Sequence, residues 1–277
     1  MILLDGKKLA LAQNKKLQQR IKVLRQKGII PGLAVILVGQ DPASAVYVRN
    51  KQRLCHDSGI NFYLTELSQS TPAEQIKKKI SELNKNKKVH GIIIQLPLPA
   101  KLDPLALISA IDPQKDVDGL HPMNMGLLPF GKELFVPATP KGVIDLLQKY
   151  KIPVVGKKAV VVGFGYVAGL PLSLLLARAK ATVTIAQDKT KDLTKLLQGA
   201  DIVVSAVGRP GLIKGEMIKA GATVIDVGVT KKGDKWVGDV QFASVSKKAK
   251  YLTPVPGGVG PLTVSALLDN VVTAAEY

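Results

Sequence analysis

The sequence has little sulfur and few aromatic side chains. Of 277 residues, one is cysteine (Cys55), and 4% are Phe, Trp or Tyr. A single cysteine excludes an internal disulfide and fits a reducing cytosol, so we expect a cytoplasmic protein. It also cannot form a zinc knuckle. His56, His90 and His121 stand at none of the HxxxH or HExxH spacings that bind zinc, so we expect no metal.

Acidic residues are scarce as well. The chain has 21 Asp plus Glu against 39 Lys plus Arg, which gives a formal net charge of +18. Such an excess marks either a surface for an anionic partner or a lysine-rich solvated exterior. The lysines are scattered through amphipathic segments, and the interleaving of aromatic with basic residues that is typical of RNA-binding proteins is missing. We therefore expect no nucleic-acid partner.

Long uncharged stretches are rare too. Residues 159–177 are long enough to be considered as a membrane span, but they contain three glycines and Pro171. Their first half is typical of a strand and their second half of a helix, which favours a buried strand, turn and helix. The N-terminal residues lack the uninterrupted apolar core of a signal peptide. We expect no membrane association.

What the chain does have is a regular alternation of helical and strand patterns. In the first part, the hydrophobic periodicity predicts helices at 7–27, 44–59 and 72–86, and strands at 32–39, 60–67 and 89–96. Ser44 is placed to cap the second helix, and Gly59 to end it. This order and the apolar strands are typical of a parallel α/β unit.

A Pro- and Gly-rich stretch at 112–140 then marks a domain boundary. A helix at 139–150 follows, with Thr139 as its cap and Pro140 in its first turn. Strands are expected at 158–163, 181–186, 201–208 and 222–229, with a helix after each of the first three. The alternation predicts a second parallel sheet, of the nucleotide-binding type.

The turn after the first of these later strands reads Gly-Phe-Gly-Tyr-Val-Ala and fits the dinucleotide fingerprint G-x-G-x-x-G/A. Gly163 allows the tight turn, Gly165 lets the backbone approach a pyrophosphate, and the small Ala168 lets the helix pack on the strand. Asp188 follows the next strand, where a carboxylate can bind ribose hydroxyls. The alternatives are a turn with no ligand, and an Asp188 that caps a helix starting near Thr190.

Polar residues also mark a site in the first unit. Tyr47 and Lys51 are one helical turn apart and share a face, and Cys55 continues the row. Gln95 follows a buried strand, at the carboxyl end where parallel sheets build their sites. The alternative for Lys51 is a lysine whose stem packs beside a half-buried tyrosine while its charge reaches solvent.

Two loops complete the set of candidates. The motif DVDG contains Asp116 and Asp118, which are either site residues or aspartates that form a turn. The loop TPVPGGVGPLT contains Pro256 and Gly257. Its prolines restrict the backbone, and its glycines allow a ligand to approach the backbone closely.

Several motifs occur here in the order seen in one family: GQDPASAVYVRNK, GIIIQLPLP, DVDGLHPMNMG, VVGFGYVAGLPLSLLL and TPVPGGVGPLT. The chain resembles the bifunctional methylenetetrahydrofolate dehydrogenase/methenyltetrahydrofolate cyclohydrolase family over about residues 3–275. The resemblance implies two α/β domains with parallel sheets and a cleft between them. Residues 1–120 with a returning helix at about 262–277 would bind folate, and 121–261 would form a Rossmann domain. Homodimers are common in the family.

The resemblance also implies the reaction. A nicotinamide cofactor would oxidise 5,10-methylenetetrahydrofolate to the methenyl form, and water would open that cation to 10-formyltetrahydrofolate, within one-carbon metabolism and purine biosynthesis. Lys51 matches the catalytic lysine, and Gln95 the glutamine that orients it. Tyr47 matches the tyrosine that stacks on the aminobenzoate, and Asp118 the carboxylate that grips the pterin. Pro256 and Gly257 would contact the substrate.

Two departures from the family pattern concern the cofactor. The turn usually reads G-R-S or G-A-S where this chain has Gly163, Phe164 and Gly165, and a Ser-Lys-Thr is usual where this chain has Asp188 and the two residues after it. With Val229, these residues would bind the dinucleotide. Asp188 and the missing arginine favour NAD over NADP. A cyclohydrolase that has lost the dehydrogenase is the alternative.

Overall fold

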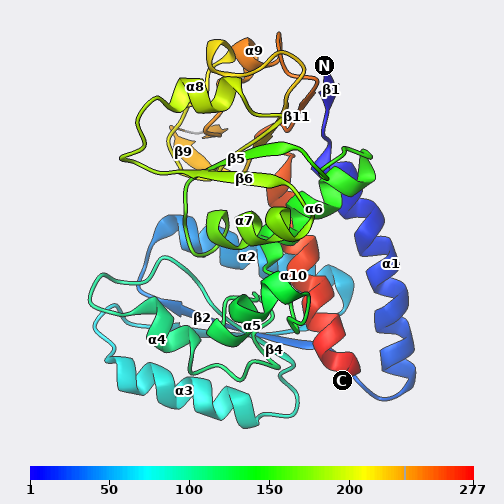
Figure 1. The fold of residues 1–277 in the computed structure, drawn as a ribbon. Coiled ribbons are helices and arrows are strands. Elements are labelled where there is room, and N and C mark those ends of the chain that lie inside the picture. The colour runs from blue at the N-terminus through cyan, green and yellow to red at the C-terminus, as the bar shows by residue number, and fades with distance from the viewer. Residues whose placement is uncertain (234) are drawn as a thin grey trace. The chain divides into compact units, whose positions relative to one another are not determined.

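The computed structural model describes residues 1–233 and 235–277, and of Ala43 the backbone alone. The described chain forms two compact units, which we name after their sheets (Figure 1). The six-stranded unit comprises residues 1–11, 128–132 and 137–266, and the three-stranded unit comprises 12–127, 133–136 and 267–277. Each is an α/β unit with a parallel sheet, as predicted.

The three-stranded unit is built on β2, which lies between two parallel neighbours in the order β3-β2-β4. Because β2 is central and covered on both faces, all its residues are buried. The strands are β2 (Gly32–Val38), β3 (Asn61–Leu67) and β4 (Gly91–Ile94). The helices of this unit are α2 (Pro42–Ser58), α3 (Ala73–Lys85), α4 (Pro104–Ile108) and α5 (Pro122–Leu127).

Helix α2 begins earlier than predicted. The prediction that Ser44 caps it is wrong, because the cap is Asp41, whose carboxylate accepts the backbone N–H of Ser44 at 2.7 Å. Ser44 itself is buried inside the helix. The predicted end is confirmed: Gly59 adopts a φ of 79°, and its N–H donates to the carbonyls of Cys55 and His56.

The six-stranded sheet has the order β1-β11-β8-β7-β5-β6, and all of its pairs are parallel. An apolar cluster covers each face, which explains the uninterrupted apolar strands. The strands are β1 (Ile2–Leu3), β5 (Lys158–Val162), β6 (Thr182–Ala186), β7 (Ile202–Ser205), β8 (Thr223–Asp226) and β11 (Tyr251–Leu252). Strands β9 (Thr230–Lys232) and β10 (Lys235–Val237) form a separate antiparallel pair.

The helices of this unit correct two predictions. Thr139 does not cap α6, which begins one residue earlier, after Pro137, and has no side-chain cap. The helix expected between β7 and β8 is a single 3-10 turn, η2 (Gly215–Met217), because the chain there is mostly loop. The remaining elements are η1 (Leu128–Phe130), α6 (Ala138–Lys149), α7 (Gly169–Arg178), α8 (Leu193–Gln198) and α9 (Phe242–Val245).

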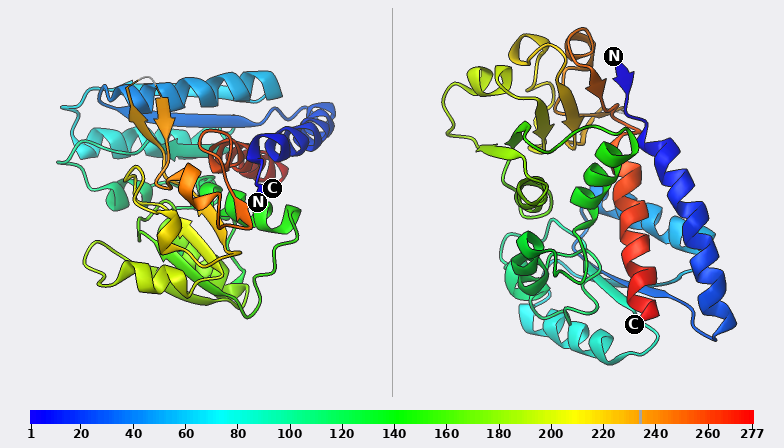
Figure 2. Two further views of the ribbon diagram at one scale, coloured as in Figure 1. Left: turned by 90° about the horizontal axis from the view of Figure 1, so that it is seen from above. Right: turned by 45° about the vertical axis from the view of Figure 1, so that its right-hand side comes forward.

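Two long helices, α1 (Gly6–Gln26) and α10 (Val259–Glu276), each contribute residues to both units. Within the three-stranded unit their later parts run side by side, as the right-hand view of Figure 2 shows. The Arg20 guanidinium joins them by donating to Asp269 Oδ1 at 2.5 Å and to Glu276 Oε2 at 2.6 Å. None of the helices in the described ranges is long and apolar enough to cross a membrane.

Candidate active site

Lys51 and Gln95 meet at the carboxyl end of the three-stranded sheet. The backbone N–H of Gln95 donates to Ile36 on β2 at 2.9 Å, which continues the strand pairing and holds the residue just past β4. Its side-chain N–H donates to the carbonyl of Leu96 at 2.7 Å, and its Oε1 accepts from Lys51 Nζ at 2.9 Å. The amide is therefore turned so that its oxygen faces the lysine.

Asp118 is the anionic neighbour of this lysine. Burial lowers the pKa of Lys51, and the Asp118 carboxylate opposes that shift. Burial likewise raises the pKa of Asp118, and the Lys51 ammonium opposes it. Desolvation thus moves the two groups toward their neutral forms while their mutual attraction favours the ions. Such a lysine loses its proton more readily than an exposed one, which suits it to acid–base chemistry.

Tyr47 and Cys55 lie on the same face of α2 as the lysine, as the spacing predicts. The Cys55 side chain is buried, and burial raises the pKa of its thiol to about 12, with an opposing effect of Lys51. The thiol is therefore neutral and packs as a small apolar side chain. Tyr47 is 39% exposed, which leaves much of its surface open to a ligand.

Asp116 and Asn124 shape the turn that carries Asp118. The buried Asp116 carboxylate accepts the backbone N–H groups of Leu120 and His121 at 3.2 and 2.7 Å, and the Asn124 amide at 2.8 Å. Burial raises the pKa of Asp116 to about 7, although these bonds favour its ionised form. Of the two alternatives for Asp116, a site residue or an aspartate that forms a turn, these bonds support the second. Asn124 lies within the motif DVDGLHPMNMG, but the sequence pattern assigns it no role.

A second support of this turn comes from the end of the chain. The Asn270 side chain on α10 donates to the carbonyls of Val117 at 2.8 Å and Val136 at 3.0 Å. Asn270 is buried, so these bonds satisfy its amide. Nothing in the sequence links residue 270 to residue 117, and this contact was missed.

The glycine turn of the six-stranded unit lies between β5 and α7, as predicted. Gly163 has a φ of 105°, and a Cβ there would lie 2.6 Å from the carbonyl oxygen of Ala206. The close-packing role expected of Ala168 belongs to Gly169, where a Cβ would collide with the carbonyl oxygen of Gly163. A Cβ at Gly165 would meet nothing within 4 Å, so that glycine leaves open space above the turn.

The other expected cofactor residues lie on the surface of this unit. Phe164 is 42% exposed and Val229 is 38% exposed. Asp188 is exposed and lies 3.6 Å from Lys189 Nζ. Helix α8 begins only at Leu193, and the Thr190 hydroxyl accepts the N–H of Gln187, so Asp188 caps no helix near Thr190.

Pro256 and Gly257 lie in the six-stranded unit. Gly257 has a φ of 107°, a conformation that favours glycine, and its carbonyl accepts the N–H of Lys7 at 2.9 Å. The structure brings Lys51, Gln95 and Asp118 together in the three-stranded unit. Over the described ranges, no group of three or more His, Cys, Asp and Glu side chains is arranged to hold a metal ion.

Two family models match the chain. The catalytic-domain model of tetrahydrofolate dehydrogenase/cyclohydrolase matches residues 4–118, and its NAD(P)-binding-domain model matches 137–277. Bifunctional protein FolD of Moorella thermoacetica is 49% identical over 275 residues, which cover 99% of this chain and 98% of that protein.

Solved structures agree with the family models. Bifunctional FolD methylenetetrahydrofolate dehydrogenase/cyclohydrolase from Campylobacter jejuni is 42% identical, with a TM-score of 0.97 over 100% of this chain and 99% of its own. The Trypanosoma brucei enzyme, solved with NADP and an inhibitor, is 41% identical, with a TM-score of 0.95 over 99% of this chain and 97% of its own.

Proposed function

The chain belongs to the tetrahydrofolate dehydrogenase/cyclohydrolase family, and we propose that Lys51, Gln95, Asp118 and Tyr47 carry its chemistry. It is a bifunctional enzyme of one-carbon metabolism. It oxidises 5,10-methylenetetrahydrofolate with a nicotinamide cofactor and hydrolyses the methenyl product to 10-formyltetrahydrofolate. Both domain models match, which favours this reading over a cyclohydrolase that has lost the dehydrogenase.

Lys51 is the group we assign to proton transfer, and its bond to Gln95 is the observation that carries the proposal. In the oxidation, the nicotinamide ring accepts a hydride from the methylene carbon, which leaves the methenyl cation. Burial of Lys51 disfavours its ammonium form, and a neutral amine does not repel that cation.

In the hydrolysis, the Lys51 amine takes a proton from water as the water oxygen bonds to the methenyl carbon. The same proton then passes to the ring nitrogen N5. The bond between that nitrogen and the carbon breaks as the new hydroxyl group loses its remaining proton to solvent, which gives the formyl product and releases one proton overall. Gln95 Oε1 accepts an N–H of the neutral amine and so fixes the direction of its single lone pair.

The folate itself would be held by the residues around this lysine. The half-buried Asp118 has carboxylate oxygens that can accept two N–H bonds from the pterin, a charge-assisted pair. Tyr47 offers an exposed ring for stacking on the aminobenzoate. We assign further substrate contacts to Pro256 and Gly257. Calorimetry with folate on Lys51→Met and Tyr47→Ala variants tests these roles; unchanged affinity for Tyr47→Ala would remove the stacking role.

For the cofactor we propose Gly163, Phe164, Gly165, Asp188 and Val229, with NAD preferred over NADP. An exposed carboxylate at 188 would stand beside the 2′-phosphate of NADP. At ~4 Å and an effective dielectric near 20, like charges repel by roughly 4 kcal/mol before screening. The neighbouring lysine offsets part of this, so we expect a preference of about 10- to 100-fold.

The cofactor proposal is tested by kcat/KM for the two dinucleotides. NAD should be the better substrate, and Asp188→Ser should reduce the difference. Preference for NADP in the unaltered enzyme would overturn the assignment.

We further infer that residues 1–120 form the folate-binding domain together with the last helix. We also infer that the protein is a cytoplasmic homodimer. Strand β3 supports the dimer: it stands at the edge of its sheet with no strand on its outer side within the described ranges, and its Leu64 is 38% exposed. Such edges pair readily with a second chain. Light scattering should give twice the chain mass, and Leu64→Lys should lower it; a monomeric parent enzyme would refute the inference.

A further inference from the structure

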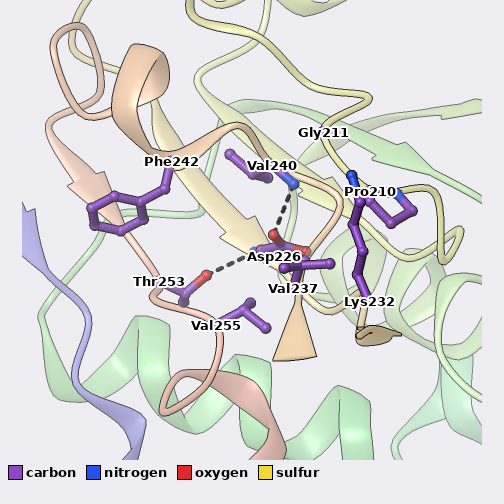
Figure 3. Close-up of a pocket in the computed structure, with 10 residues that line it drawn as sticks. Pro210, Gly211, Asp226, Lys232, Val237, Val240, Phe242, Thr253 and Val255 are labelled. Atoms are coloured by element: carbon purple, nitrogen blue, oxygen red, sulfur yellow. Dashed lines mark hydrogen bonds between the residues drawn. The ribbon is translucent and has the colours of Figure 1, made fainter. Parts of the chain in front are cut away.

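A pair of buried carboxylates in the six-stranded unit has no role in the site described so far. Asp226 ends β8 and is 3% exposed. Its carboxylate accepts the backbone N–H groups of Gly228 and Asp239 at 3.0 Å each and of Val240 at 2.8 Å. Figure 3 shows it at the wall of a cavity of about 360 Å³, with Lys232 among the lining residues. Three N–H donors suit an ionised carboxylate.

Asp239 is the second member of the pair and is fully buried. Its Oδ2 accepts from the Ser205 hydroxyl and from the Val207 N–H, both at 2.9 Å. Its Oδ1 is buried and has no hydrogen-bond partner among the residues that the structure describes. A side chain at Gly228 would collide with the Asp239 carboxyl. The backbone at Gly228 therefore packs directly against a buried carboxyl group. Burial of such a group is unfavourable, which points to a role beyond packing.

The pair joins three segments of the chain. The three donors to Asp226 flank the β9–β10 hairpin, one before it and two after it. Asp239 ties this base of the hairpin to residues 205–207, which are the last residue of β7 and the two residues after it. Residues 205–207 in turn pack against the glycine turn, since Ala206 is what a Cβ at Gly163 would strike. In open parallel sheets, the carboxyl ends of neighbouring strands are where dinucleotides bind.

We propose that Asp226 and Asp239 are positioning residues for the dinucleotide: together they hold residues 205–207 and the segment around Val229 in the geometry that binds the cofactor. The inference rests on the proposed cofactor role of Gly163 and Val229. It predicts that the pair acts on cofactor affinity and leaves folate binding and the cyclohydrolase step unaltered.

The pair should also make cofactor binding sensitive to pH. Burial raises the pKa of Asp226 to about 6, and the nearby Asp239 carboxylate adds to the rise. The charged group that acts on it is Asp239, and Lys232 is among the residues that line the same cavity. When Asp226 gains a proton, one of its oxygens becomes a donor, so an N–H at the base of the hairpin loses its acceptor. The hairpin should loosen as the pH falls through about 6.

Trp236 gives a readout that needs neither substrate nor cofactor. It is the single tryptophan of the chain and lies on β10, in the hairpin that Asp226 brackets. Its fluorescence should change with a midpoint near pH 6. Asp239→Asn keeps an oxygen for Ser205 and Val207 but removes the neighbouring charge, so the midpoint should move down by about 0.5 pH unit or more. Glu216→Gln, a change of an exposed acid in the same unit, should leave it in place.

Kinetics supply the second arm. Asp239→Ala removes the acceptor of two hydrogen bonds and should raise the cofactor KM by about 10-fold or more, with folate KM and cyclohydrolase kcat within about twofold. The inference is overturned if the Trp236 signal of the parent enzyme is flat between pH 5 and 7, or if Asp239→Asn leaves its midpoint unchanged. Equal effects on cofactor and folate KM would also overturn it. A parent enzyme without dehydrogenase activity would instead refute the proposed function. The Trp236 fluorescence would still test whether Asp226 and Asp239 control the hairpin.

Discussion

Replacing Lys51 by methionine tests the active site most directly. Methionine keeps an unbranched apolar stem of similar length on α2 but removes the Nζ atom that donates to Gln95 at 2.9 Å. If this atom is the base of the hydrolysis and also places the folate for the hydride transfer, both activities should fall by about 10²- to 10⁴-fold, the usual contribution of acid–base catalysis and of substrate positioning. At about 1.4 kcal/mol per tenfold, that is roughly 3–6 kcal/mol of barrier.

The cost to the fold should be smaller. The Gln95 oxygen loses its donor, which costs about 1–3 kcal/mol, but the fold no longer buries an ammonium group, which offsets part of that loss. The pKa of Asp118 should rise further, because the cation that opposes its burial is gone. We therefore expect a change in the free energy of unfolding of less than about 2 kcal/mol.

The assay follows the absorbance of the methenyl compound, which forms in the oxidation and disappears in the hydrolysis, and that of the reduced nicotinamide, which forms in the oxidation. Circular dichroism and urea unfolding verify the fold. Arg53→Met is the matched control: it removes a positive charge from an exposed position of the same helix and should change neither activity by more than about twofold. A folded Lys51→Met enzyme with near-normal rates in both assays would refute the reasoning. So would an equal loss in the Arg53→Met control.

Three further predictions concern other parts of the molecule. Asp118→Ala should weaken folate binding by about 1.5–3 kcal/mol in calorimetry, and it should shift the Lys51-dependent limb of the pH–rate profile to lower pH because the anion that raises that pKa is gone. Gly165→Ala should leave the Tm unchanged yet raise the cofactor KM, whereas Gly169→Ala should lower the Tm, because only the second Cβ meets the backbone. The pKa of Asp116 lies near 7 in the fold, above its unfolded value, so the fold binds the extra proton. The free energy of unfolding should therefore fall by about 1.4 kcal/mol per pH unit from this group as the pH rises from 4 to 7, and urea titrations of Asp116→Asn should lack that slope.

Much of the site could be predicted because its determinants are local. The spacing of Tyr47, Lys51 and Cys55 places them on one face of any helix that spans them. The position of Gln95 after an apolar run places it at a strand end in any parallel sheet. The glycine turn can also be predicted from its spacing after an apolar strand, although the contact that excludes a side chain at Gly163 comes from the distant Ala206.

Other features had no local signal. The cap of α2 was assigned to Ser44 and belongs to Asp41, because several residues near a helix start can accept an N–H and the backbone path decides among them. Strand β1 has only the residues Ile2 and Leu3, too few for a periodic pattern, and exists because β11 offers it a partner. The close-packing glycine is Gly169, since the angle at which α7 leaves the turn sets which residue faces Gly163.

From the sequence alone, the alternation of elements, the parallel class of both sheets, the shared helix face of Tyr47 and Lys51 and the glycine turn followed, because hydrophobic periodicity and turn chemistry act over a few residues. The tertiary structure alone decided that Asn270 supports the turn of Asp118, and that Asp239 joins Ser205 to the base of a hairpin. These are contacts between residues that the sequence pattern does not relate. They form because each buried polar group needs a partner, and which partner lies within reach is set by the packing of the whole unit.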